Sequence, residues 1–178
     1  MFADLASQVA IRVRVAFALG LAERAMDVLT VDAELFSMAR AGLDLAWDWE
    51  RGMAVSPDAI DEYIDGKDDD LNTFVGLNDH DVTLASAIIA VTFAIGYAAN
   101  HAYLQEGRGR YMSVQAAQCD ELSRMDELIE NLLRAVPSSE PEIIRLHSFV
   151  VSTYPTTIPN SLGPQVDRAT ILPLIVPI

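Results

Sequence analysis

The chain has 178 residues, the size of one ordinary domain. Twelve Lys and Arg residues against twenty-six Asp and Glu residues give a net charge of −14. That charge argues against nucleic acid and anionic membrane surfaces as partners, because both are bound through basic side chains. The 51% hydrophobic content excludes a disordered chain, and the single cysteine excludes an internal disulfide framework. We expect an acidic globular protein of the reducing cytoplasm.

Helical periodicity runs through most of the chain and predicts an all-α fold. No proline lies between Pro57 and Pro137, and strand-like alternation is absent. We expect one domain over residues 1–152, a compact bundle of about six helices. In chain order, these helices are predicted near residues 4–28, 30–52, 57–64, 78–107, 113–134 and 139–152. Their predicted N-caps include Thr30, Asn78 or Asp79, Ser113 and Ser139, the last in a capping box with Glu142.

The second predicted helix carries two tryptophans and one unusual carboxylate. A helical wheel places Trp47 and Trp49 on its wide apolar arc, so we expect both in the structural core. Glu50 falls inside the same arc, where an unpaired charge is costly. We interpret Glu50 as a core residue bonded to Arg12, Arg14 or backbone amides. The alternative is a catalytic or ligand-holding carboxylate with a raised pKa in an internal pocket.

A dense run of carboxylates follows, and we call residues 58–70 the acidic run. Its acidic members are Asp58, Asp61, Glu62, Asp65, Asp68, Asp69 and Asp70. The first four are spaced i, i+3, i+4 and i+7, which predicts that they share one face of a short helix. Two interpretations stay open: a negative surface that receives a basic partner, or a solvated face.

The segment between Asp81 and Glu106 contains no Asp, Glu, Lys or Arg and is long enough to span a bilayer. Much of it is alanine, which contributes little to membrane insertion, and several polar residues interrupt it. This composition favours the buried central helix of a bundle, so we expect no membrane association.

Residues 153–178 differ in kind from the rest of the chain. They hold five of the eight prolines and end in the apolar stretch 171–178. Proline blocks both helix and central strand, so this segment is predicted to be extended. Since exposed apolar surface normally finds cover, we expect the tail to pack across a groove of the bundle.

Patterns for metal binding and catalysis are absent from the sequence. Asp68, Asp70 and Asn72 begin like an EF-hand loop, but Thr73 and Asp79 stand where glycine and glutamate are required. No histidine follows a glutamate by three residues, and there is no glycine-rich phosphate loop or nucleophile elbow. We therefore expect no metal, no cofactor and no enzymatic activity.

Three segments of the chain form a recognisable set: LAWDWE at 45–50, VSPDAIDEYID at 55–65 and AIIAVTFAIGYAA at 87–99. They resemble the Immunity protein 6 family of bacterial polymorphic toxin systems. The first two are similar to the family's Trp-x-Trp and the short-helix pattern that follows it. The resemblance covers roughly residues 35–133, whereas the very acidic third helix and the proline-rich tail depart from it.

The resemblance implies a non-catalytic helical protein that binds a cognate toxin domain and blocks it. Because toxins that attack nucleic acid tend to be basic, the resemblance favours the acidic run as the surface that binds the toxin. We expect the protein to be a monomer or a homodimer. Two other functions remain: a small helical enzyme or ligand-binding domain that uses Glu50, and an adaptor that oligomerises through the apolar tail.

Overall fold

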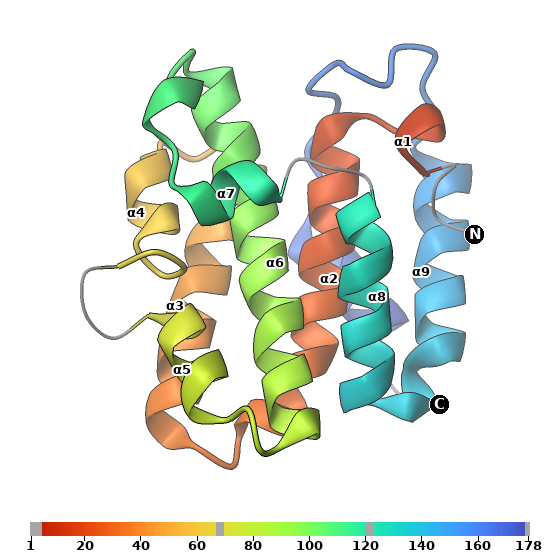
Figure 1. Ribbon diagram of the computed structural model, residues 1–178. Coiled ribbons are helices and arrows are strands. Elements are labelled where there is room, and N and C mark those ends of the chain that lie inside the picture. The colour runs from red at the N-terminus through yellow and green to blue at the C-terminus, as the bar shows by residue number, and fades with distance from the viewer. Residues whose placement is uncertain (1–4, 67–69, 120–122, 177–178) are drawn as a thin grey trace.

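The computed structural model describes residues 5–66, 70–119 and 123–176, and Figure 1 shows their arrangement. Within these ranges the chain forms ten α-helices and three short 3-10 helices. The described residues contain no strand. Their β-type pairing is an isolated antiparallel bridge between Val9 and Pro155. The all-α prediction is therefore confirmed.

The structure contains more and shorter helices than the six expected. They are α1 (Leu5–Gln8), α2 (Ile11–Leu29), α3 (Ala33–Glu50), α4 (Pro57–Asp61), α5 (Leu71–Leu77), α6 (Val82–Gln105), η1 (Gly109–Tyr111), α7 (Val114–Gln118), α8 (Ser123–Ala135), η2 (Pro137–Ser139), α9 (Glu140–Thr153), α10 (Arg168–Ile171) and η3 (Leu172–Leu174). The predicted first helix is interrupted at Ala10, whose ψ of 168° is extended. The predicted fifth helix corresponds to α7 and α8, while α5 and α10 form where no full helix was expected.

Side-chain caps explain several of the observed helix starts. Ser113 accepts a hydrogen bond from a backbone N–H of α7, as predicted. The predicted caps of α3 and α6 were wrong, because Asp32 and Asp81 accept the N-terminal hydrogen bonds of these helices. The predicted capping box was also wrong: the Ser139 hydroxyl donates to the Val136 carbonyl oxygen at 2.7 Å and makes no cap hydrogen bond to α9.

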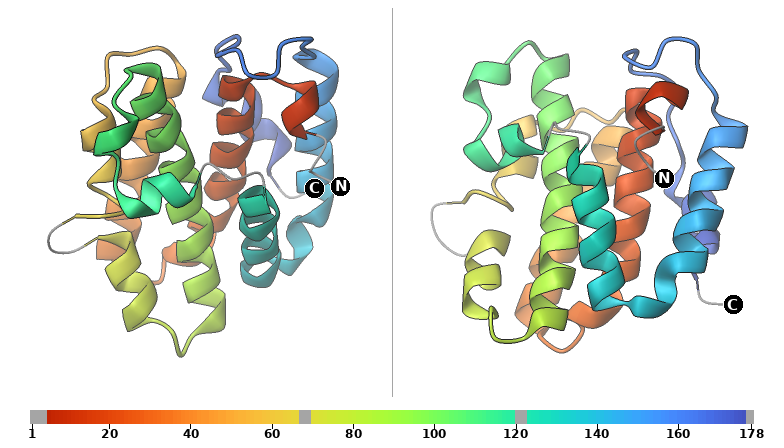
Figure 2. Two further views of the ribbon diagram at one scale, coloured as in Figure 1. Left: turned by 45° about the horizontal axis from the view of Figure 1, so that its top comes forward. Right: turned by 45° about the vertical axis from the view of Figure 1, so that its right-hand side comes forward.

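Helix α6 lies at the centre of the bundle. It contacts α2, α3, α4, α5, α7 and α8, with α4 and α5 on one side and α8 on the other (Figures 1 and 2). This surround explains the near absence of a polar face on α6, since a helix covered on all sides has no need of one. By length and composition α6 is apolar enough to cross a membrane, but 72% of its most apolar window is buried inside the bundle.

The tail after α9 is only partly extended. Residues 154–167 are non-helical, but α10 and η3 follow, so the expectation of a wholly extended tail was wrong. Asp167 caps α10, and Pro173 lies in the first turn of η3, where proline is tolerated. Val166, Ile171 and Ile175 are buried, α10 contacts α2 and η3 contacts α9 (Figure 2).

Candidate functional site

Both tryptophans of α3 lie in the core. Trp47 has no exposed surface, and its indole N–H donates to Glu23 Oε1 at 3.0 Å. Trp49 is 5% exposed, with the Arg12 guanidinium 5.7 Å from the centre of its ring. These contacts hold α3 against α2.

Glu50 is fully buried beneath the C-terminal tail. Its Oε1 accepts a hydrogen bond of 2.6 Å from the Val166 backbone N–H, and its Oε2 has no partner among the described residues. Burial raises the pKa of Glu50 to about 7, against the opposing effects of the Val166 N–H, Arg12 and Arg51. With no exposed surface, this carboxylate offers a substrate no access, so nothing in its geometry favours the catalytic alternative.

Asp58, the first member of the acidic run, is exposed but paired. The Arg108 guanidinium donates to both of its oxygens, at 2.9 and 2.8 Å, and the Tyr103 hydroxyl donates at 2.9 Å. The hydrogen bond from Arg108 is the largest cause that lowers the pKa of Asp58. Its charge is therefore largely neutralised within the protein.

Asp61 and Asp70 are buried and hold local structure. Asp61 accepts from the Ser113 backbone N–H at 3.0 Å and from the Ser113 hydroxyl at 2.6 Å, which ties α4 to the start of α7. Asp70 caps α5 by accepting from the Thr73 N–H at 2.7 Å. Each is only 6% exposed, so neither presents its charge to a partner.

Glu62 and Asp65 are the exposed members of the acidic run for which no ion pair occurs among the described residues. Partial desolvation, and then the charges of Asp61 and Asp70, raise the pKa of Asp65. The expectation of one shared helical face was wrong, because α4 ends at Asp61 and that residue points inward. Asp68 and Asp69 lie outside the described residues.

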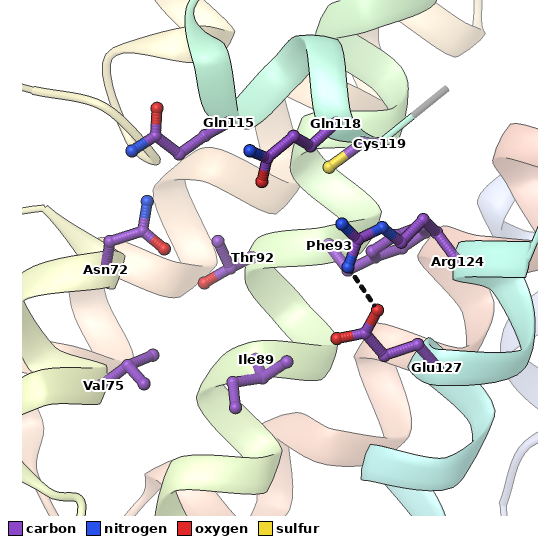
Figure 3. Close-up of a pocket in the computed structure, with 10 residues that line it drawn as sticks. All are labelled: Asn72, Val75, Ile89, Thr92, Phe93, Gln115, Gln118, Cys119, Arg124 and Glu127. Carbon is purple, nitrogen blue, oxygen red and sulfur yellow. Dashed lines mark hydrogen bonds and ion pairs between the residues drawn. The ribbon is translucent and has the colours of Figure 1, made fainter. Parts of the chain in front are cut away.

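A groove beside the acidic run is formed by α5, α6, α7 and α8, with a volume of about 170 Å³ (Figure 3). Its lining residues are Asn72, Val75, Ile89, Thr92, Phe93, Gln115, Gln118, Cys119, Arg124 and Glu127. Amide side chains border it on two sides, and Arg124 pairs with Glu127 at 2.6 Å along its edge (Figure 3). The buried Thr92 Oγ1 and Gln115 Oε1 have no hydrogen-bond partner among the described residues.

One side chain, that of Asn72, links the groove to the acidic run. The Asn72 side chain lines the groove and donates to the Ile64 carbonyl oxygen, next to Asp65. Cys119, 8% exposed, lines the other side; burial raises its pKa to about 12, so its thiol is not a reactive thiolate. The sequence does not reveal this groove, because it forms only where the successive helices α5 to α8 pack together and no local motif marks it.

Across the described residues, no group of three or more His, Cys, Asp or Glu side chains is placed to hold a metal ion. The polar contacts of this region instead join helices, as those of Asp58, Asp61 and Asp70 do.

These features define a small all-helical protein in which a groove of mixed polar and apolar lining lies near the acidic run. A model of the family described as immunity protein Imm6 matches residues 13–134, and the chain belongs to this family. It is therefore an immunity protein, of a class directed against a toxin and generally not enzymatic. No curated protein and no solved structure matches the chain. The matched range includes the acidic run and the groove, whereas α9 and the tail lie beyond it.

Proposed function

We propose that the chain neutralises its cognate toxin by forming a tight complex with the toxin domain through the acidic run and the adjoining groove. It acts in the cytoplasm, as a monomer or homodimer. The observation that carries this proposal is that exposed Asp65, which has no ion pair among the described residues, follows Ile64, to which the groove residue Asn72 is bonded. Two buried acceptors of that groove have no partner in the described part of the chain.

The charge of the acidic run suits a basic partner. A net charge of −14 sets up a negative potential around the whole chain, and unpaired surface carboxylates add to it locally. Such a potential raises the association rate of an oppositely charged protein and disfavours acidic competitors. Glu62 and Asp65 serve this purpose because no cation of the described chain neutralises them.

The groove suits a partner rich in hydrogen-bond donors. Thr92 Oγ1 and Gln115 Oε1 are buried acceptors, and leaving such atoms unsatisfied is costly. A Lys or Arg side chain, or a backbone N–H of a bound segment, would satisfy them. Val75 and Ile89 supply the apolar surface that a buried interface centre needs.

Co-expression with the toxin domain encoded in the neighbouring gene tests this proposal. We expect cells to survive and the two proteins to elute together in size-exclusion chromatography at a fixed stoichiometry. A matched double variant, Val75→Arg with Ile89→Arg, fills the groove with charge and should abolish co-elution while circular dichroism stays helical. If wild-type protein protects cells without ever forming a complex, neutralisation by binding is wrong.

A further inference from the structure

A second cavity lies away from the groove, where the start of α2, the end of α6 and the tail meet. Its volume is about 430 Å³, and none of its lining residues lines the groove. Ile11, Arg14, His101, Leu104, Asn160 and Leu162 are among the residues around it. Three of these, Ile11, Asn160 and Leu162, lie outside the range matched by the family model.

Arg14 is a buried cation in this cavity for which the described residues supply no counter-ion. It is 7% exposed, its Nη2 donates to the Pro159 carbonyl oxygen at 3.3 Å, and its Nε has no partner among these residues. No ion pair of Arg14 occurs among the described residues, in a chain with an excess of carboxylates. Burying a charge without a partner is strongly unfavourable, so a bound anion would stabilise this side chain.

Arg12, two residues earlier on the same helix, shows the contrast. It is 8% exposed, but its guanidinium lies over the Trp49 ring and its charge acts on the buried Glu50. Arg12 therefore lies near one titratable carboxyl group inside the fold, although its Nε, like that of Arg14, has no partner among the described residues. Arg14 lines the cavity instead.

His101 adds a neutral polar group to the same cavity. It is 7% exposed, and its Nε2 has no partner among the described residues. Burial, and then the charge of Arg14, lower the pKa of His101 to about 4, so its imidazole is uncharged near neutral pH. The first turn of the 19-residue helix α2 adds only a partial positive charge. The cavity therefore presents one full positive charge.

The remaining lining residues are mixed: Ile11, Leu104 and Leu162 are apolar, Tyr97 adds an aromatic ring, and Gln105 and Asn160 add neutral amides. One positive charge, three aliphatic side chains and an aromatic ring match a monoanion with an apolar body better than a phosphate, which carries more charge and more oxygens to satisfy. We propose that this cavity binds a small monocarboxylate with an apolar body. Its carboxylate pairs with Arg14 and hydrogen-bonds His101, and its body contacts Ile11, Leu104 and Leu162.

Titration of the wild-type protein with benzoate, followed by backbone amide NMR, tests this site without any variant. In a buffer free of phosphate and carboxylate, we expect saturable shifts at Ile11, Leu104 and Leu162. The uncharged isostere benzamide should bind at least about 10-fold more weakly, because it lacks the charge that pairs with Arg14. Absence of saturation, shifts that map to other surfaces, or equal binding of benzamide would each overturn the proposal.

Two matched variants separate the role of Arg14 from a general loss of a buried arginine. Arg14→Met keeps an apolar stem and should weaken benzoate binding by at least about 10-fold. Arg12→Met removes an arginine of equal burial and should leave benzoate affinity within about twofold of wild type. Equal losses in the two variants, or unchanged affinity in Arg14→Met, would contradict the site.

Discussion

The Val166 backbone N–H donates a hydrogen bond of 2.6 Å to Glu50 Oε1, across 116 positions of sequence. This contact joins the C-terminal tail to the end of α3 and explains a carboxylate on the apolar arc of that helix. Without the tail, Glu50 would face solvent or an empty space. The tail is thus part of the fold, although the match to the family model ends at residue 134.

Replacing Glu50 with Gln should remove a pH dependence of stability. The pKa of Glu50 is about 7 when folded and near 4.5 when unfolded, so its stabilising effect is full below about pH 4.5 and lost above about pH 7. Between about pH 5 and pH 8, the free energy of unfolding of wild type should fall relative to Glu50→Gln by roughly 2–3 kcal/mol. Urea denaturation at both pH values measures this. Parallel pH profiles would show that Glu50 stays ionised in the folded protein, beside Arg12, Arg51 and Asp167.

Gly20→Ala should destabilise the protein by overpacking. An added Cβ would lie 2.6 Å from Ile171 Cγ2 and 3.0 Å from Leu146 Cδ2, which costs about 1–3 kcal/mol. Ile171→Ala alone should cost about 2–5 kcal/mol, because Ile171 has no exposed surface. Equilibrium denaturation of the double variant should give less than the sum of the two losses. Strict additivity would mean that the tail does not pack on α2 at this point.

Asp61→Asn should reduce stability without changing toxin association. An amide NH₂ group would replace one Asp61 oxygen and face the Ser113 N–H or hydroxyl. We expect a loss of about 1–3 kcal/mol in the free energy of unfolding. Glu62→Gln is the neighbouring control and should stay within about 0.5 kcal/mol of wild type. Slower toxin binding by well-folded Asp61→Asn would place this carboxylate in the interface instead.

Trp49→Ala should lower the free energy of unfolding by about 3–5 kcal/mol, the range for truncating a buried aromatic side chain. Protection against the toxin should then decline only in proportion to the folded fraction, with Trp49→Phe as a milder control. Thermal unfolding and cell survival, measured together, check this. A fully folded Trp49→Ala protein that no longer protects would make the tryptophan a contact residue.

The elements predicted well are those defined by their own composition. Helix α6 is apolar on every side, and the start signals Pro57 and Ser113 act as local chemistry dictates. At most one helical turn was expected near residues 69–74, where α5 forms, because its cap, Asp70, was interpreted as surface charge of the acidic run. Ser139 failed as a cap because the 3-10 turn from Pro137 directs its hydroxyl to the Val136 carbonyl oxygen.

Partners distant in sequence account for most of what the site prediction lacked. The sequence does not distinguish a carboxylate that bonds Ser113 from one that faces water. It therefore could not show that Asp61 is buried and Glu62 exposed. The pairing of Asp58 with Arg108 likewise joins residues 50 positions apart. The position of Glu50 on the apolar arc was local information, whereas its partner Val166 was not.

The association rate with the toxin domain tests the central claim, that the acidic run receives a basic toxin surface. Stopped-flow kinetics would compare two double variants of equal charge change. The first combines Glu62→Gln and Asp65→Asn. The control combines Glu34→Gln and Glu140→Gln, which replace exposed acidic residues of α3 and α9. We predict that the first double variant associates roughly 3- to 10-fold more slowly at about 10 mM salt, that the difference shrinks at about 150 mM, and that the control stays near wild type. Equal rates for both double variants at low salt would contradict the claim.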